Sequence, residues 1–183
     1  MTNTQTKTID HARQNAAGWY SSIDEMVAAL DIESAAGRYA AGLSRERCIK
    51  LLAGIDIECS DEQPDEDLRD AVAENLADGT LEIDDFEFDE DAARQTIEES
   101  PLSIEVRSGW CTPGETMGPE EYSILLSTGG PALRLIGDLD QHNEPETAEL
   151  QYQDWGTPWT PYHDENVDED VLIKYAQCFY FGE

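Results

Sequence analysis

Carboxylates are the side chains of this sequence most able to do chemistry, because they can hold divalent cations or transfer protons. The 183 residues contain 41 Asp and Glu, so many such patterns match by chance and the spacing has to decide. An EF-hand calcium loop requires Gly at its sixth position and Glu at its twelfth. Loops counted from Asp85 or Asp164 have Glu in place of the Gly and lack the final Glu. The sequence therefore predicts no dedicated metal site.

Histidine and cysteine offer a second chemistry, which the spacing also fails to support. The three histidines lack the companions of a zinc site. Cys111 could pair in space with His142 or His163 as a nucleophile. A thiolate needs positive neighbours, however, and this region has only Arg107 and Arg134. The four cysteines are most simply idle or buried thiols of a reducing compartment. Since nucleotide-binding and hydrolase motifs are also missing, we expect no enzyme and no cofactor.

The net charge of −30 is unevenly distributed along the chain. Residues 1–55 hold six acids and six bases, residues 56–99 hold nineteen acids and two bases, and residues 138–170 hold eleven acids and no base. Solubility needs a net charge of only about 2–8 in magnitude on a small domain, and an excess of one sign destabilises the folded state. A halophile-type surface would be acidic throughout. The partition therefore favours a binding face for a cationic partner.

The N-terminal part of the chain carries helical signals. Residues 1–17 are polar, and we expect them to be frayed. Ser22 and Glu25 fit a capping box that would open a helix. A second helix is expected from Ser44 to Ala53, and its basic residues are interpreted as a solvated face.

The acidic middle of the chain predicts two more helices. The first begins near Pro64 and ends at Gly79, with apolar residues at helical spacing: Leu68, Val72 and Leu76. The apolar residues of 81–88 change parity, so a bulge or turn is required at 84–85. A short acidic helix is then expected over 89–99.

The last part of the chain has the pattern of strands. Residues 102–110 alternate, residues 121–140 fit a hairpin with its turn at 128–131, and residues 147–159 form a further strand. Residues 168–181 are a helix with an apolar stripe. We therefore predict an α+β fold: N-terminal helices, an antiparallel sheet of three or four strands, and a C-terminal helix packed on the sheet.

Composition divides the chain into three segments. These are a neutral helical segment, 1–55, a strongly acidic helical segment, 56–99, and a β module with its helix, 100–183. They form one compact domain or two small ones. The sequence lacks the run of about 18 apolar residues that a membrane span requires, and its first residues lack the apolar core of a secretory signal. We therefore expect a cytoplasmic protein of a bacterial host cell, without a membrane partner.

The segment Q-D-W-G-T-P-W at 153–159 places two tryptophans among Gly and Pro. It could be a stacking platform for an aromatic ligand, or a rigid corner that closes one end of the sheet, and we favour the corner. In that interpretation four rings share one core: Trp155, Trp159, Phe179 and Phe181. Replacing Trp155 by Ala would then lower the melting temperature sharply.

The C-terminal part of the chain also carries a resemblance. Through QDWGTPW and the ending FYFGE, residues 100–183 resemble a recurring family of uncharacterised acidic proteins of bacterial plasmids, integrative elements and phages. The resemblance implies a mobile-element context and supplies no activity and no functional residues. The acidic middle resembles, in charge character only, the DNA-mimicking antirestriction and anti-CRISPR proteins of such elements.

These features together predict an acidic face for a basic partner. Carboxylates on one face of a helix recur about every 6 Å, so they can occupy a groove that is made for phosphates. The expected face consists of Asp65, Glu66, Asp67, Asp70, Asp84, Asp85, Glu87, Asp89, Glu90, Asp91, Asp164, Glu165, Asp168, Glu169 and Asp170.

The function expected from this face is that of a non-enzymatic counter-defence inhibitor, of the anti-CRISPR or antirestriction type. Its partner would be a basic nucleic-acid-binding protein or complex of the bacterial host, and it would not bind nucleic acid itself. One alternative is an accessory structural or regulatory protein of a mobile element. Another is an enzyme with a carboxylate-held metal, which the failed spacings disfavour. The sequence leaves open whether the chain forms a homodimer.

Overall fold

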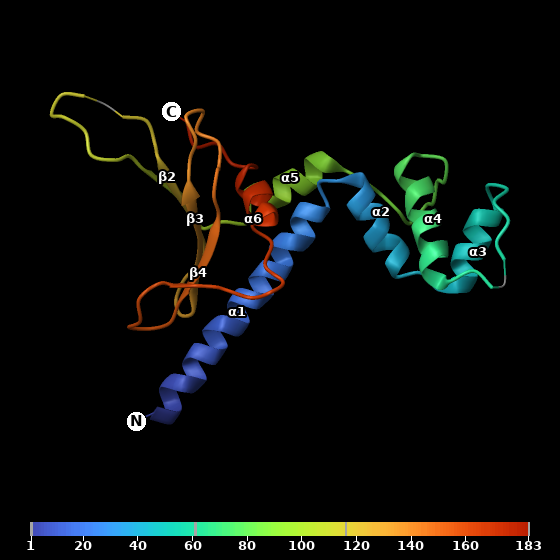
Figure 1. The fold of residues 1–183 in the computed structure, drawn as a ribbon, viewed down its shortest axis with the longest axis horizontal. Helices are drawn as coiled ribbons and strands as arrows, with labels where there is room; N and C mark the ends of the chain where they lie inside the picture. Colours follow the sequence, from blue (N-terminus) through green and yellow to red (C-terminus); the bar gives the residue numbers. More distant parts are fainter. Residues whose placement is uncertain (1, 61, 116, 183) are drawn as a thin grey trace. The chain divides into compact units, whose positions relative to one another are not determined.

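The computed structural model describes residues 2–60, 62–115 and 117–182, with side chains from residue 11 onward. The described residues form six helices and five strands (Figure 1): α1 (Thr2–Ala28), α2 (Ile32–Ala41), α3 (Arg45–Ala53), α4 (Asp65–Ala77), α5 (Glu90–Glu98), β1 (Ser103–Arg107), β2 (Glu121–Ser127), β3 (Ala132–Asp138), β4 (Glu149–Gln153), β5 (Thr160–Pro161) and α6 (Glu169–Ala176). The predicted α+β class is confirmed. The fifth strand, only two residues long, adds one to the expected number.

The chain forms two compact units. Residues 28–93 make a helical unit, and residues up to Val27 together with those from Arg94 onward make a sheet unit. The boundaries of these units differ from positions 55 and 99, where the charge composition changes. The helical unit contains twenty acids and five bases, a net charge of −15, and the sheet unit carries the other −15 over many more residues.

Helix α1 begins much earlier than the sequence predicts. Residues 2–17 are helical, and Ser22 lies inside the helix, where its hydroxyl donates to the Gly18 carbonyl over 3.1 Å. The expected frayed segment and the capping box at Ser22 are therefore wrong. The physical reason is a buried stripe at helical spacing that continues through the cap signal: Ala12, Ala16, Ile23 and Val27.

The helical unit is built from α2, α3 and α4, which Figure 1 shows packed together. Helix α3 agrees with its prediction, with Ser44 as N-cap and Gly54 as C-cap. Helix α4 also agrees, and Gly79 follows it with φ 77°. Helix α2 was not expected. These helices share one buried core: Ala36, Ala40, Cys48, Leu52, Leu68, Val72, Leu76 and Leu81.

The sheet is antiparallel throughout, in the order β1-β2-β3-β4-β5. The hairpin turn falls between β2 and β3 as predicted, with Gly129 and Gly130 at positive φ. One row across the sheet consists of directly opposed apolar residues: Ile104, Ile124, Leu135 and Leu150. This row marks the face that contributes to the core of the unit.

Helices α1 and α6 lie along the same side of the sheet (Figure 1). Leu172 and Tyr175 of α6 are almost completely buried, and the Tyr175 hydroxyl is hydrogen-bonded to Ser100. The ring of Tyr122 on β2 stacks against Phe181 with centroids 4.8 Å apart. The expectation that the last helix packs on the sheet is thus confirmed.

The predicted aromatic core is wrong for the tryptophans. Trp155 is 78% exposed, and its indole lies against Gly130 at the hairpin turn. Trp159 is partly buried and covers the guanidinium of Arg134 at 4.4 Å. Phe181 alone of the four rings is fully buried. Glycine and proline turn this segment outward, so its rings cap side chains on the surface of the sheet.

The exposure of Trp155 changes the expected result of its replacement. A side chain that is largely in water loses little apolar burial when it is truncated, so Trp155→Ala should cost less than about 1 kcal/mol of unfolding free energy. Thermal unfolding monitored by circular dichroism tests this expectation. A fall of the melting temperature by ten degrees or more would show that the ring supports the core.

Candidate functional site: the acidic face of the helical unit

Helix α4 presents its charges opposite its core face. Leu68, Val72 and Leu76 are buried at intervals of four residues. A residue two positions away along a helix is turned by about 200°, so it points away from the core. Those positions hold carboxylates at each step, and all are exposed: Glu66, Asp70, Glu74 and, at the C-cap, Asp78. We call these four residues the α4 ladder.

The α4 ladder has a fixed geometry. At 1.5 Å per residue its members follow one another every 6 Å or so, over about 18 Å in total. Asp78 continues the helical backbone as C-cap. The Asp78 carboxylate accepts hydrogen bonds from the side-chain hydroxyl of Thr80 and from its backbone N–H, and these bonds, the hydroxyl first, lower the pKa of Asp78 below its usual value. The last member therefore stays ionised at neutral pH.

A second acidic stretch follows α4 and is tied to the same core. Asp85 accepts a hydrogen bond from the Tyr39 hydroxyl at 2.8 Å and lies 3.7 Å from the Arg47 guanidinium. Phe86 packs on the ring of Tyr39 with centroids 5.4 Å apart. Partial burial, and then the Asp85 carboxylate, raise the pKa of Tyr39, so it remains a donor. The turn expected at 84–85 is present, and it displays exposed carboxylates on a fixed backbone.

At least three of the five cations of the helical unit form contacts within it. Arg45 donates to Asp65 at 2.7 Å and to the carbonyl oxygens of Ser60 and Gln63. Arg69 of α4 donates to the carbonyl of Leu43, which lies between α2 and α3. The basic side chains of α3 thus join elements together. This is more than the solvated face that the sequence suggested.

All fifteen acids predicted for the binding face are exposed. Ten of them, from Asp65 to Asp91, belong to the helical unit, and five, from Asp164 to Asp170, belong to the sheet unit. The predicted set is therefore divided between two units. At least six of the fifteen also make structural contacts: Asp65, Asp85, Asp89, Asp164, Asp168 and Glu169.

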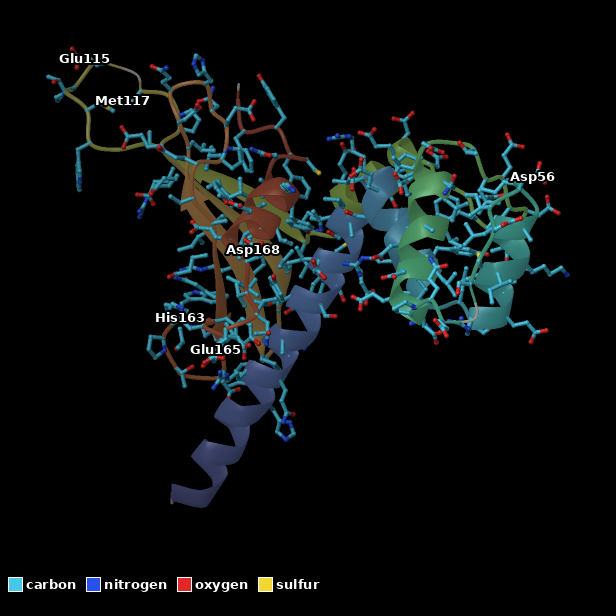
Figure 2. The ribbon with its side chains drawn as sticks, turned by 45° about the vertical axis from the view of Figure 1, so that its right-hand side comes forward. Asp56, Glu115, Met117, His163, Glu165 and Asp168 are labelled. Atoms are coloured by element: carbon cyan, nitrogen blue, oxygen red, sulfur yellow. The ribbon has the colours of Figure 1, made fainter. Side chains whose placement is uncertain are left out.

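The acids of the sheet unit have a local structural explanation. Asp168 caps α6 by accepting from the backbone N–H of Asp170, and Glu169 accepts from that of Ala148 at 3.2 Å. Asp164 lies 3.6 Å from the Arg13 guanidinium of α1. Figure 2 shows Glu165 and Asp168 on the segment that leads into α6. Capping and the helix dipole favour anions at such a place without any partner.

Two members of the α4 ladder, Glu74 and Asp78, were missed from the sequence. The signal was present, since both follow Asp70 at intervals of four residues and stand two positions after Val72 and Leu76. The anchoring of Asp85 by Tyr39 gives no such signal, because the two residues are 46 positions apart.

A cavity of about 720 Å³ lies on the sheet unit, over β1 to β4 and the beginning of α6. Its lining includes Arg107 of β1, and Arg134 and Glu149 on the adjacent strands β3 and β4. Arg134 donates twice to Gln151, whose amide donates to Glu149. Arg134, Gln151 and Glu149 are thus hydrogen-bonded to one another on this part of the sheet.

Catalytic chemistry finds little support in the described geometry. Cys111 is exposed, and its thiol donates to the carbonyl of Glu115 at 3.4 Å; it is not directed at a histidine. Cys48 and Cys178 are buried, and burial raises the pKa of both thiols. Among the described side chains, those of residues 11–60, 62–115 and 117–182, no three His, Cys, Asp or Glu are arranged to hold a metal ion.

None of the helices in the described part of the chain combines the length and apolarity needed to cross a membrane. Neither a family model, nor a curated protein, nor a solved structure matches this chain.

Proposed function

We propose that this protein is a non-enzymatic counter-defence inhibitor of a mobile genetic element. It presents carboxylates in place of nucleic-acid phosphates and blocks the basic groove of a nuclease complex in the cytoplasm of a bacterial host. The observation that carries the proposal is the α4 ladder, Glu66, Asp70, Glu74 and Asp78, exposed along one side of a helix whose other side is buried.

The spacing of the ladder suits a groove that binds nucleic acid. One strand of a DNA duplex carries a phosphate for about every 3.4 Å along the axis. Carboxylates about 6 Å apart therefore supply one negative charge for roughly every two phosphates. Since the helix is held by its own core, these charges need little ordering when a partner binds.

The overall charge supports the same proposal. The helical unit carries −15 on residues 28–93, and at least three of its five cations bond within the unit: Arg45, Arg47 and Arg69. An uncompensated field of this sign accelerates encounter with a basic partner and weakens with salt. The sequence resemblance to acidic proteins of plasmids and phages gives the context in which such a partner would be a host defence complex.

Affinity capture tests the proposal. The full chain, immobilised at its C-terminus, is incubated with bacterial lysate at low and at high salt, and retained proteins are identified by mass spectrometry. We expect a nucleic-acid-binding complex that is released by salt and displaced by duplex DNA or by guide RNA. A retained basic protein that keeps its nucleic acid while bound would favour the accessory regulatory alternative instead.

The protein itself should not bind DNA. A chain of net charge −30 is repelled by a polyanion within the Debye length of about 8 Å at physiological salt. In an electrophoretic mobility assay with the purified chain, duplex DNA should migrate as free DNA at every protein concentration. A shifted band that survives competition with nonspecific DNA would contradict the proposed mimicry.

A further inference from the structure

Strand β1 is an uncovered edge of the sheet. It lies at one end of the strand order, and all five of its residues are exposed. Three apolar side chains at alternate positions are 58%, 40% and 50% exposed: Leu102, Ile104 and Val106. An edge strand presents backbone N–H and C=O groups that are not paired within the sheet. An edge that also exposes a row of apolar side chains is suited to pairing with another strand.

The apolar row of β1 belongs to the core-facing side of the sheet. Ile104 stands directly opposite Ile124, which is completely buried, and Val106 stands opposite Tyr122, which is 3% exposed. The same face that forms the core under β2, β3 and β4 thus continues to β1 and remains open there. The alternate residues, Glu105 and Arg107, lie on the other face.

We propose that β1 pairs antiparallel with β1 of a second copy of this chain, so that the two sheets become one continuous sheet. A dimer with two-fold symmetry requires a surface that is complementary to itself. With Val106 on the symmetry axis, Glu105 of each copy stands opposite Arg107 of the other. In this register the strand is self-complementary in charge on one face. On the other face Val106 of one copy meets Val106 of the second copy, and Ile104 stands opposite Ser108.

The charges select this register among its neighbours. Centring the pair on Glu105 would place two carboxylates directly opposite each other, which destabilises a sheet. Centring it on Ile104 would place Arg107 opposite Pro101 and leave Glu105 opposite Ser103. With Val106 at the centre, two opposite-charge pairs form at the direct cross-strand separation of about 5 Å.

Neighbouring charges reinforce the pairing. Arg107 already forms an ion pair with Glu121 on β2, its direct partner in the register. In the dimer this guanidinium would lie between Glu121 of its own copy and Glu105 of the second copy. The arrangement opposes, within the sheet, the general repulsion between two chains of charge −30, which salt screens beyond about 8 Å.

Sedimentation of the full chain at physiological salt tests this proposal. We expect a concentration-dependent species of twice the 20.4 kDa chain mass. The variants Glu105→Arg and Arg107→Glu should each raise the dimer dissociation constant at least tenfold, because each places two like charges opposite each other. An equimolar mixture of the two variants should restore the dimer, since all four facing charges then pair with their opposites.

The mixing experiment separates the pairing from effects on folding. Both variants should keep the wild-type far-ultraviolet circular dichroism spectrum, because the substituted side chains are exposed. A wild-type chain that sediments as a monomer at all concentrations would overturn the proposal. So would a mixture that stays as dissociated as its components, which would show that the edge receives a strand of a different protein or none.

Discussion

Neutralising the α4 ladder is expected to weaken partner binding about 100-fold. The change is the triple replacement Glu66→Gln, Asp70→Asn and Glu74→Gln, which keeps side-chain size and removes three charges from one line. At about 1 kcal/mol per carboxylate the loss is about 3 kcal/mol, or two orders of magnitude in the dissociation constant. Binding to the captured complex, measured by surface plasmon resonance across a range of salt concentrations, should also lose much of its salt dependence.

The fold should tolerate this replacement. Glu66 lies in the first turn of α4, where the helix dipole favours an anion, and Glu74 lies near the end, where it does not. The two effects offset each other, so unfolding free energy should change by less than about 1 kcal/mol. Asp78 is left in place because it accepts hydrogen bonds from Thr80.

A matched control distinguishes positioned charge from net charge. The triple variant Glu46→Gln, Asp56→Asn and Glu58→Gln also removes three negative charges from the helical unit, but from exposed sites outside the ladder. Asp56 has φ 61°, a conformation that Asn also tolerates. Equal losses in the two triple variants would mean that only the total charge matters, and would remove the ladder from the proposed site.

The helices and strands were predictable where the signals are local. Helix α3 has Ser44 and Gly54 at its ends, and α4 has an apolar residue at every fourth position between Pro64 and Gly79. These features act within one or two turns of helix, so one sequence suffices to recognise them. Helix α2 was missed although Asp31 and Gly42 cap it, because its buried residues are the alanines Ala36 and Ala40, and no large apolar side chain is among them.

Other features depend on distant partners and could not be predicted. The cap signal at Ser22 does not start the helix, because Ala12 and Ala16 are buried and keep the chain helical before it. Their burial depends on the other elements of the sheet unit. The exposure of Val106 depends on the strand order, which places β1 at an edge. The candidate site divides in the same way. The α4 ladder follows from the four-residue spacing of its carboxylates, which is visible in the sequence. The turn at 84–85 is held by the hydrogen bond from Tyr39 to Asp85, and Tyr39 lies far away in the sequence.

The largest expected effect on stability comes from Gly137 on β3. A β-carbon at this position would collide with the carbonyl oxygen of Thr147 and lie 2.7 Å from the ring of Tyr122. The Tyr122 hydroxyl donates to that same carbonyl at 2.8 Å, and its ring is 3% exposed. Burial, followed by the nearby carboxylates of Glu169 and Asp138, raises the pKa of Tyr122, so it remains a donor.

The replacement Gly137→Ala should therefore cost about 3 kcal/mol, because overpacking costs about 1–3 kcal/mol and a lost buried hydrogen bond about 1 kcal/mol more. At about 2–4 °C per kcal/mol for a chain of this size, the melting temperature of the sheet unit should fall by about 10 °C. Gly18→Ala is the matched control in the same unit, since a β-carbon there meets open space and alanine favours the helix by about 0.5–1 kcal/mol. A Gly137→Ala chain that melts with the wild type would show that β3 and β4 can separate without loss, and that the register around Tyr122 does not hold the sheet together.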